Sequence, residues 1–139
     1  MNENPLHREI IEEHATNPLG NSKLETFSHQ GFWKSEKTGN TCVVQILVEK
    51  SEVCKIGYHL QGSVLALASA SIMVEQVRGK KIIEAKAVVS QLMLFFDAHS
   101  VRLPDELSVY ETIRRFPDRH DCALLAWRGF SIAVADLDQ

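Results

Sequence analysis

The sequence contains few cysteines and no long hydrophobic run. It has three cysteines among 139 residues, an odd number that cannot all pair within the chain. Since the first residues also lack the pattern of a signal peptide, we expect a protein of the reducing cytoplasm without a disulfide framework. The longest nearly uninterrupted apolar stretch, Leu92 to Phe96, is far too short to span a bilayer, so we expect no membrane insertion.

Several motifs of common enzyme and binding classes are also missing. There is no glycine-rich phosphate loop after a predicted strand, and no G-x-S-x-G nucleophile elbow. The net charge of -3 argues against a nucleic-acid binder that depends on phosphate contacts. No two histidines have the helical spacing of metal ligands, and we expect His7 and His14 to face solvent on the first helix.

The composition is that of an ordinary globular protein, with 45% hydrophobic and 24% charged residues. We therefore expect a single domain over residues 1–139. The first predicted element is a helix from Leu6 to Ala15, with Ile10 and Ile11 facing inward. The segment Phe27 to Trp33 alternates weakly, which fits either a short edge strand or a loop with two aromatic side chains on the core.

Two strands are predicted next. The segment from Thr41 to Glu49 is rich in β-branched and apolar residues and follows a turn, so it should be a strand. The alternating segment from Val53 to Leu60 should return as its hairpin partner. The face with Cys54, Ile56, Tyr58 and Leu60 is the more apolar one, which predicts that Cys54 is buried.

A buried helix from Gly62 to Lys80 should organise the fold. Small residues fill its first half, so another element can approach its backbone closely. Ser63 is suited to cap its N-terminus, and Gly79 is suited to the left-handed position that ends it.

Three further helices are predicted after the central one. They should cover Lys81 to His99, a shorter segment that begins at Leu103-Pro104-Asp105, and Cys122 to Ala135 after a cap at Asp121. The predicted core faces comprise Ile82, Ile83, Ala85, Val89, Leu92, Met93 and Phe96; Leu107, Tyr110 and Ile113; and Leu124, Leu125, Trp127, Phe130, Ile132 and Val134. The element order predicts an α+β fold, in which a small antiparallel sheet of about three strands packs against four to five helices.

Two cysteines lie at places where a thiol could react. Cys42 begins a predicted strand, and Cys122 directly follows the predicted cap of the last helix, where a thiolate is stabilised. For each cysteine taken alone, a small buried hydrophobic residue is the more common alternative. Two thiolates are fewer than the four ligands of a closed zinc site or an iron–sulfur cluster.

At this point the sequence resembles the U-type iron–sulfur cluster assembly scaffolds, that is the NifU-like, IscU and SufU proteins, and SufU most closely. Segment 11–18 is similar to the family's I-L-D-H-Y-K-N-P, and Gly39 to Val44 lies where the family has N-P-T-C-G-D. Gly62 to Lys80 is similar to G-C-A-I-S-x-A-S-A-S-M-M followed by E-x-V-x-G-K. Phe116 to Trp127 is similar to F-P-x-R-x-K-C-A-x-L-x-W. The resemblance implies an α+β fold with a three-stranded sheet.

The resemblance also implies where the site lies and shows that it is altered. The family's three cysteines and one aspartate correspond to Cys42, Val44, Ser63 and Cys122, so only two of the four ligands remain. Valine cannot bind a metal, and a neutral hydroxyl is a poor ligand for a soft metal. Asp121 stands where the family has a basic residue or histidine, and it is the candidate third ligand beside Cys42 and Cys122.

Two hypotheses follow from the resemblance. The first is a carrier, not an enzyme, that acts in iron–sulfur cluster assembly. It would hold zinc, iron or a transient cluster, or accept sulfur from a cysteine desulfurase on Cys122 or Cys42. The second is a binding module on the same fold, without metal or cluster, that docks on a desulfurase or another assembly protein and regulates it.

Overall fold

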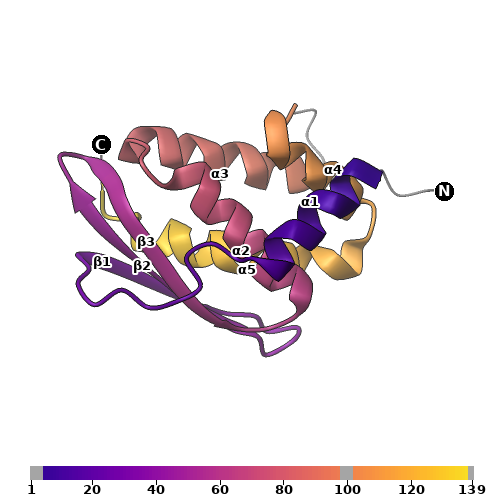
Figure 1. Cartoon of the computed structure of the whole chain (residues 1–139), viewed down its shortest axis with the longest axis horizontal. Coiled ribbons are helices and arrows are strands. Elements are labelled where there is room, and N and C mark those ends of the chain that lie inside the picture. The colour runs from indigo at the N-terminus through magenta and orange to yellow at the C-terminus, as the bar shows by residue number, and fades with distance from the viewer. Residues whose placement is uncertain (1–4, 98–101, 138–139) are drawn as a thin grey trace.

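The fold combines one three-stranded sheet with helices that lie on one side of it (Figure 1). The computed structural model describes residues 5–97 and 102–137. The elements in chain order are α1 (Pro5–Thr16), β1 (His29–Lys34), β2 (Thr41–Glu49), β3 (Glu52–Gln61), α2 (Val64–Val77), α3 (Ile82–Phe96), a 3-10 helix η1 (Asp105–Val109), α4 (Tyr110–Arg114) and α5 (Pro117–Ala133). The predicted α+β class is confirmed. Among the described helices, none is long and apolar enough to cross a membrane.

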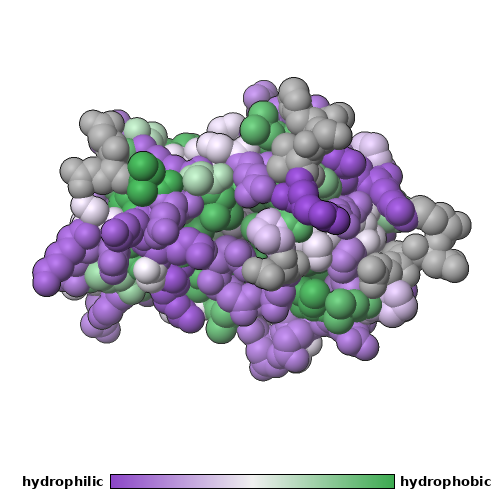
Figure 2. Space-filling view, turned by 90° about the horizontal axis from the view of Figure 1, so that it is seen from above, coloured by the Kyte–Doolittle hydropathy of each residue, from purple (hydrophilic) through white to green (hydrophobic). Residues whose placement is uncertain are grey.

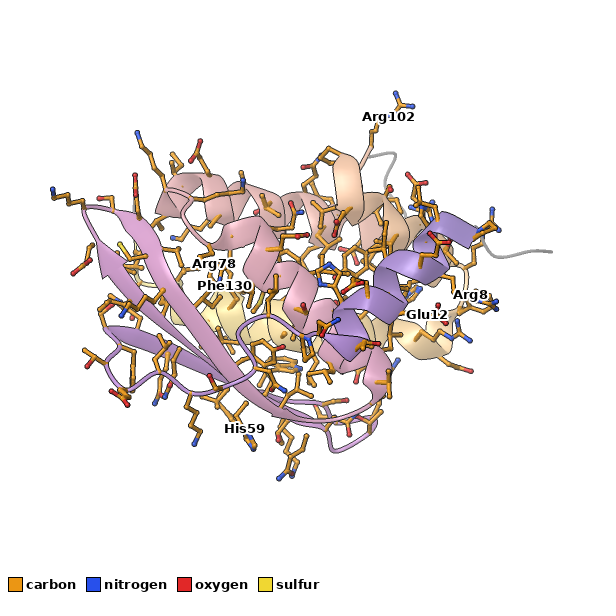
Figure 3. All side chains as sticks on the ribbon, viewed as in Figure 1. Arg8, Glu12, His59, Arg78, Arg102 and Phe130 are labelled. Atoms are coloured by element: carbon orange, nitrogen blue, oxygen red, sulfur yellow. The ribbon has the colours of Figure 1, made fainter. Side chains whose placement is uncertain are left out.

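The sheet is antiparallel in the order β1-β2-β3, with β2 in the centre. The ambiguous segment before residue 34 is thus an edge strand, paired with β2 along its whole length. Cys42, Val44 and Ile46 alternate along β2 on the buried face. Figure 3 shows Phe130 of α5 between the sheet and the other helices, whereas His59 points away on the outer face of the sheet.

A β-bulge in the hairpin overturns the predicted burial of Cys54. The pairing shifts between Leu47, which lies opposite Lys55, and Val48, which lies opposite Val53. Cys54 is the extra residue, and its side chain is exposed. The bulge also explains why Val53 is buried together with Ile56, although a regular strand would place them on opposite faces.

Helix α5 crosses the sheet at a point where two glycines meet. A Cβ atom added to Gly31 of β1 would lie 2.1 Å from the carbonyl oxygen of Gly129 in α5. A Cβ atom added to Gly129 would lie 3.0 Å from a methyl carbon of Val44. Because the helix and sheet backbones nearly touch here, no side chain fits between them at Gly31, and Val44 is enclosed.

The small residues of α2 serve close packing, as predicted, and two of its serines also form buried hydrogen bonds. The Ser69 hydroxyl donates to the Ala123 carbonyl oxygen of α5 at 2.6 Å and contacts the Tyr110 hydroxyl. The Trp127 indole N–H donates to the same tyrosine oxygen at 2.8 Å. The central helix is therefore tied to α4 and α5 by polar contacts inside the core.

Both predicted ends of α2 are confirmed. The Ala66 amide donates to Ser63 Oγ at 3.1 Å, and Gly79 follows the helix with φ of 83°. Replacing Ser63 by alanine leaves that amide without its partner. We expect Ser63→Ala to lower the free energy of unfolding by about 1 kcal/mol, measured by urea denaturation. Ser63→Asp, which keeps a capping oxygen, is the control and should lose less; equal losses would contradict a capping role.

The two histidines of α1 are buried, contrary to the prediction that they face solvent. His7 Nδ1 lies 2.7 Å from Thr112 Oγ1, and His14 Nδ1 lies 2.6 Å from Ser71 Oγ. Helix α1 packs on α2 with these polar side chains inward, while Ile10 and Ile11 are only partly buried. The hydroxyl partners satisfy the ring nitrogens, which is why burial is tolerated.

Two isoleucines in the predicted core faces are exposed. Ile83 of α3 is 63% exposed and Ile132 of α5 is 43% exposed. Helix α3 instead buries residues at the spacing of Ile82, Ala85 and Val89, which leaves Ile83 on the outer side. Residues 98 and 99, predicted to end this helix, lie outside the described residues. Figure 2 shows the face on the side of α3, where separate hydrophobic patches lie among hydrophilic side chains.

Helix α5 begins earlier than predicted. Pro117 is its first residue, and Phe116 rather than Asp121 precedes it. Proline suits the first helical turn because the amide that it lacks has no partner there. Cys122 therefore lies in the second turn, so the argument that it opens the helix is wrong.

Candidate functional site

The fold brings the segments that carry the family ligand positions to one end of the molecule. Thr41 at the start of β2 pairs with Gln61 at the end of β3, two residues before Ser63. The Asp121 carboxylate of α5 accepts a hydrogen bond from the Ser35 hydroxyl. Since the Ser35 amide donates to the Asn40 carbonyl at 2.8 Å, α5 is linked to the β1–β2 turn directly before Cys42.

Cys42 is placed as a core residue. It pairs with Trp33 in β1 and with Leu60 in β3, and it is only 1% exposed. Burial raises the pKa of its thiol to about 12. Because the thiolate is the form that binds metals and attacks sulfur, this environment disfavours both reactions.

Val44 and Ser63 offer no ligand atoms to a soft metal. Val44 lies two residues after Cys42 on β2 and is fully buried. Its methyl group lies against Gly129. Ser63 is exposed at the start of α2, where its oxygen already accepts the Ala66 amide. The residues present therefore do not fit a closed zinc site or a fully ligated cluster at these four positions.

Cys122 is the accessible thiol of this region. It is partly buried against the core, whereas Cys42 is enclosed. The neighbouring Asp121 carboxylate is half-buried and held by the Ser35 hydroxyl. The region therefore offers one partly exposed cysteine and, one residue before it in α5, a carboxylate that Ser35 holds.

An apolar pocket of about 330 Å³ opens beside this end of α2. Val64 and Leu65, which directly follow Ser63, form one wall, and Ile11 of α1 and Ile113 of α4 form others. Arg119 of α5, three residues before Cys122, also lines it. Val64 is 69% exposed, which is unusual for a residue of the central helix. No local sequence pattern predicts this pocket, because α1, α2, α4 and α5 each contribute to it.

Known proteins of similar sequence and structure agree on one family. The chain is 22% identical over 139 residues to the iron–sulfur cluster assembly scaffold protein IscU of Thermotoga maritima, covering 96% of both chains. It is 25% identical over 137 residues to the zinc-dependent sulfurtransferase SufU of Bacillus subtilis, covering 94% of this chain and 90% of the relative.

A solved structure shows the same fold. The N-terminal part of a nitrogen-fixing NifU-like protein from Brucella abortus superimposes with a TM-score of 0.83 at 20% identity, over 91% of this chain and 90% of that one. The family described as the NifU-like N terminal domain matches residues 6–139. The resemblance in the sequence motifs is thereby confirmed, and the chain belongs to the NifU-like N-terminal domain family.

Proposed function

We propose that this protein is a sulfur acceptor of iron–sulfur cluster assembly, a carrier that receives sulfur on Cys122. The observation that carries the proposal is the accessible Cys122 within a family whose members include a scaffold and a sulfurtransferase. Cys42 is the second acceptor candidate, but its burial favours Cys122. Asp121, the residue before Cys122 in α5, is held in place by Ser35.

The transfer step needs one thiolate and one persulfide donor. The Cys122 thiolate would attack the terminal sulfur of the persulfide on a cysteine desulfurase. The new S–S bond forms on Cys122 as the donor's S–S bond breaks, and the donor cysteine leaves as a thiolate. Val64 in the first turn of α2 is 69% exposed, and its apolar surface suits contact with the donor protein.

Sulfur transfer to Cys122 can be measured directly. Full-length protein is incubated with a cysteine desulfurase and labelled L-cysteine, and the persulfide is located by mass spectrometry. We expect about one sulfur per chain on Cys122, and at least tenfold less in Cys122→Ala. Cys54→Ser is the matched control, because Cys54 is exposed at the far end of the β2–β3 hairpin.

The loss of family ligands favours a second function. With Val44 and Ser63 in place of two ligands, the chain could dock on a desulfurase and regulate it without carrying sulfur. Binding to the desulfurase without sulfur on any cysteine would support this function and contradict the acceptor role. Sulfur that remains in Cys122→Ala would instead assign the acceptor to another thiol.

A further inference from the structure

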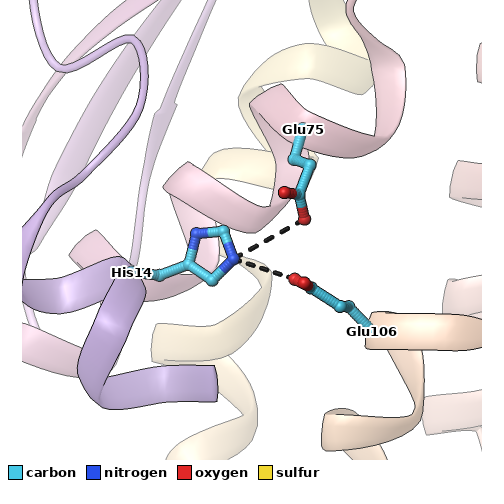
Figure 4. A group of neighbouring side chains, drawn as sticks. All are labelled: His14, Glu75 and Glu106. Atoms are coloured by element: carbon cyan, nitrogen blue, oxygen red, sulfur yellow. Dashed lines mark hydrogen bonds and ion pairs between the residues drawn. The ribbon is translucent and has the colours of Figure 1, made fainter. Parts of the chain in front are cut away.

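Three side chains from distant parts of the chain meet near the C-terminal end of α2, away from Ser63. Figure 4 shows His14 of α1 pointing toward Glu75 of α2 and Glu106 of η1. His14 Nε2 lies 2.9 Å from Glu106 Oε1 and 3.6 Å from Glu75 Oε1. All three candidate ligand atoms lie within 4.8 Å of one another.

The separations match those that a small metal ion requires. Zinc binds histidine nitrogen and carboxylate oxygen at about 2.1 Å, so two ligand atoms of a tetrahedral site lie roughly 3.4 Å apart. The two observed distances from His14 Nε2 fall on either side of this value. An ion could therefore enter with shifts of a few tenths of an ångström at the two glutamates.

The histidine is held as metal-bound histidines are. Its ring is buried, and Nδ1 is 2.6 Å from Ser71 Oγ, which itself accepts the Leu19 amide at 2.9 Å. A hydroxyl can donate to Nδ1 or accept from it. Ser71 can therefore accept from a protonated Nδ1 and leave the Nε2 lone pair free, which is how outer contacts orient metal-binding histidines.

The carboxyl groups of Glu75 and Glu106 also interact with each other. Their mutual hydrogen bond raises the pKa of Glu75 and lowers that of Glu106. Arg78 is a cation near Glu75, and it favours ionised Glu75. The carboxyl side chains are 41% and 40% exposed, which leaves the gap open to solvent and a coordination position open to water.

We propose that His14, Glu75 and Glu106 bind one divalent transition-metal ion of the zinc class. One imidazole and two carboxylates suit zinc, manganese or ferrous iron, and lack the sulfur that copper(I) or a cluster prefers. The site is distinct from the family ligand positions, since Ser63 and Glu75 are twelve residues apart on one helix, roughly 18 Å. It goes beyond the proposed sulfur acceptance, because it uses no thiol.

The site would also have a structural effect. It joins α1 to α2 and to η1, which are already linked by the His14–Ser71 and Ser108–His7 contacts and by apolar packing. An ion that binds only the folded chain stabilises it. Bound metal should therefore raise the melting temperature.

Zinc titration of a background without accessible thiols tests the site. The Cys54→Ser/Cys122→Ala protein is titrated with Zn²⁺ by calorimetry. We expect one ion per chain. Glu75→Gln and Glu106→Gln in the same background should each weaken binding by at least about 100-fold. Glu111→Gln, an exposed glutamate of α4, should leave it unchanged.

Three results would overturn the proposal: no Zn²⁺ binding in the thiol-depleted background, unchanged affinity in both glutamine variants, or equal loss in Glu111→Gln. If the glutamine variants fail to fold, the absorption spectrum of Co²⁺ bound to the thiol-depleted protein decides instead. We expect d–d bands without a sulfur-to-cobalt charge-transfer band. A charge-transfer band of that kind would reject the site. Sulfur transfer to Cys122 is measured separately, so either proposal can fail alone.

Discussion

Val44→Asp should destabilise the protein by about 4 kcal/mol or more, although the substitution restores the aspartate that the family carries at this position. Val44 is fully buried between the sheet and α5, with a methyl group against Gly129. A carboxylate there would be an uncompensated buried charge, which costs about 3–5 kcal/mol in addition to the lost apolar burial. Since domains are stable by only about 5–15 kcal/mol, this loss would remove a large share of the total stability. Urea denaturation followed by tryptophan fluorescence measures the loss.

Two companion variants separate the effect of burial from the effect of the charge on the stability of Val44→Asp. Val43→Asp places the same charge on the opposite face of β2, where the side chain is only partly buried, and should cost less than about 1 kcal/mol. Val44→Asn is polar but uncharged. Burial raises the pKa of an aspartate, so the folded Val44→Asp chain binds its proton more tightly than the unfolded chain. The free energy of unfolding of Val44→Asp should therefore fall increasingly below that of Val44→Asn as the pH rises above about 4. Below that pH the difference should vanish.

The opposite result would change the description of the site. If Val44→Asp is as stable as Val43→Asp, the carboxylate must reach solvent. Residues 41–44 would then leave the strand and form a loop, as the N-P-T-C-G-D resemblance implies for the family. In the structure they instead pair with both β1 and β3, and Val43 stands where the family has a flexible glycine.

The sequence predicts those features of the fold that depend on local pattern. Strand β2 matches its predicted bounds, because nine residues of β-branched and apolar character follow a turn. The cap and the terminating glycine of α2 were also identified from residue type alone. The start of α5 was missed although its signal, Pro117 at the first helical position, is present in the sequence.

Other features depend on contacts that no local pattern contains. The bulge at Cys54 is a property of how two strands pair, and alternation alone places this cysteine on the wrong face. The cluster of His14 joins residues 61 and 92 positions away, so its histidine was predicted to be exposed. The four ligand positions were located only through the family resemblance. The burial of Cys42 and Val44 then follows from β2 beginning at Thr41.

Cys42 should react with iodoacetamide at least about 1,000-fold more slowly than an unfolded cysteine at pH 8. With its pKa raised to about 12, only about one Cys42 thiol in 10,000 is ionised at that pH, against roughly a tenth of ordinary cysteines. The side chain is also 1% exposed, which hinders the reagent further. Mass spectrometry of the peptides after timed labelling measures each rate. Labelling in denaturant is the control, and all three cysteines should then react alike.

The same burial predicts a pH dependence of stability. The folded chain keeps the Cys42 proton up to about pH 12, whereas the unfolded chain loses it near the ordinary value of 9.0. Above that pH the native state binds more protons than the unfolded state, so stability falls by about 1.4 kcal/mol per pH unit from this residue. Cys42→Ala should remove this slope, measured as the difference between the two urea-denaturation profiles from pH 8 to 11.

The alkylation rates of Cys42 and Cys122 also decide between the two sulfur acceptor candidates. A persulfide donor needs the attacking thiolate to reach its terminal sulfur, and Cys42 provides neither ionisation nor access while β2 is paired. Slow alkylation of Cys42 beside measurable alkylation of Cys122 leaves Cys122 as the acceptor on the native fold. If Cys42 instead reacts as fast as Cys122, the start of β2 must open in solution. The two cysteines would then be available together, and a metal or sulfur site shared between them would replace the single-thiol acceptor.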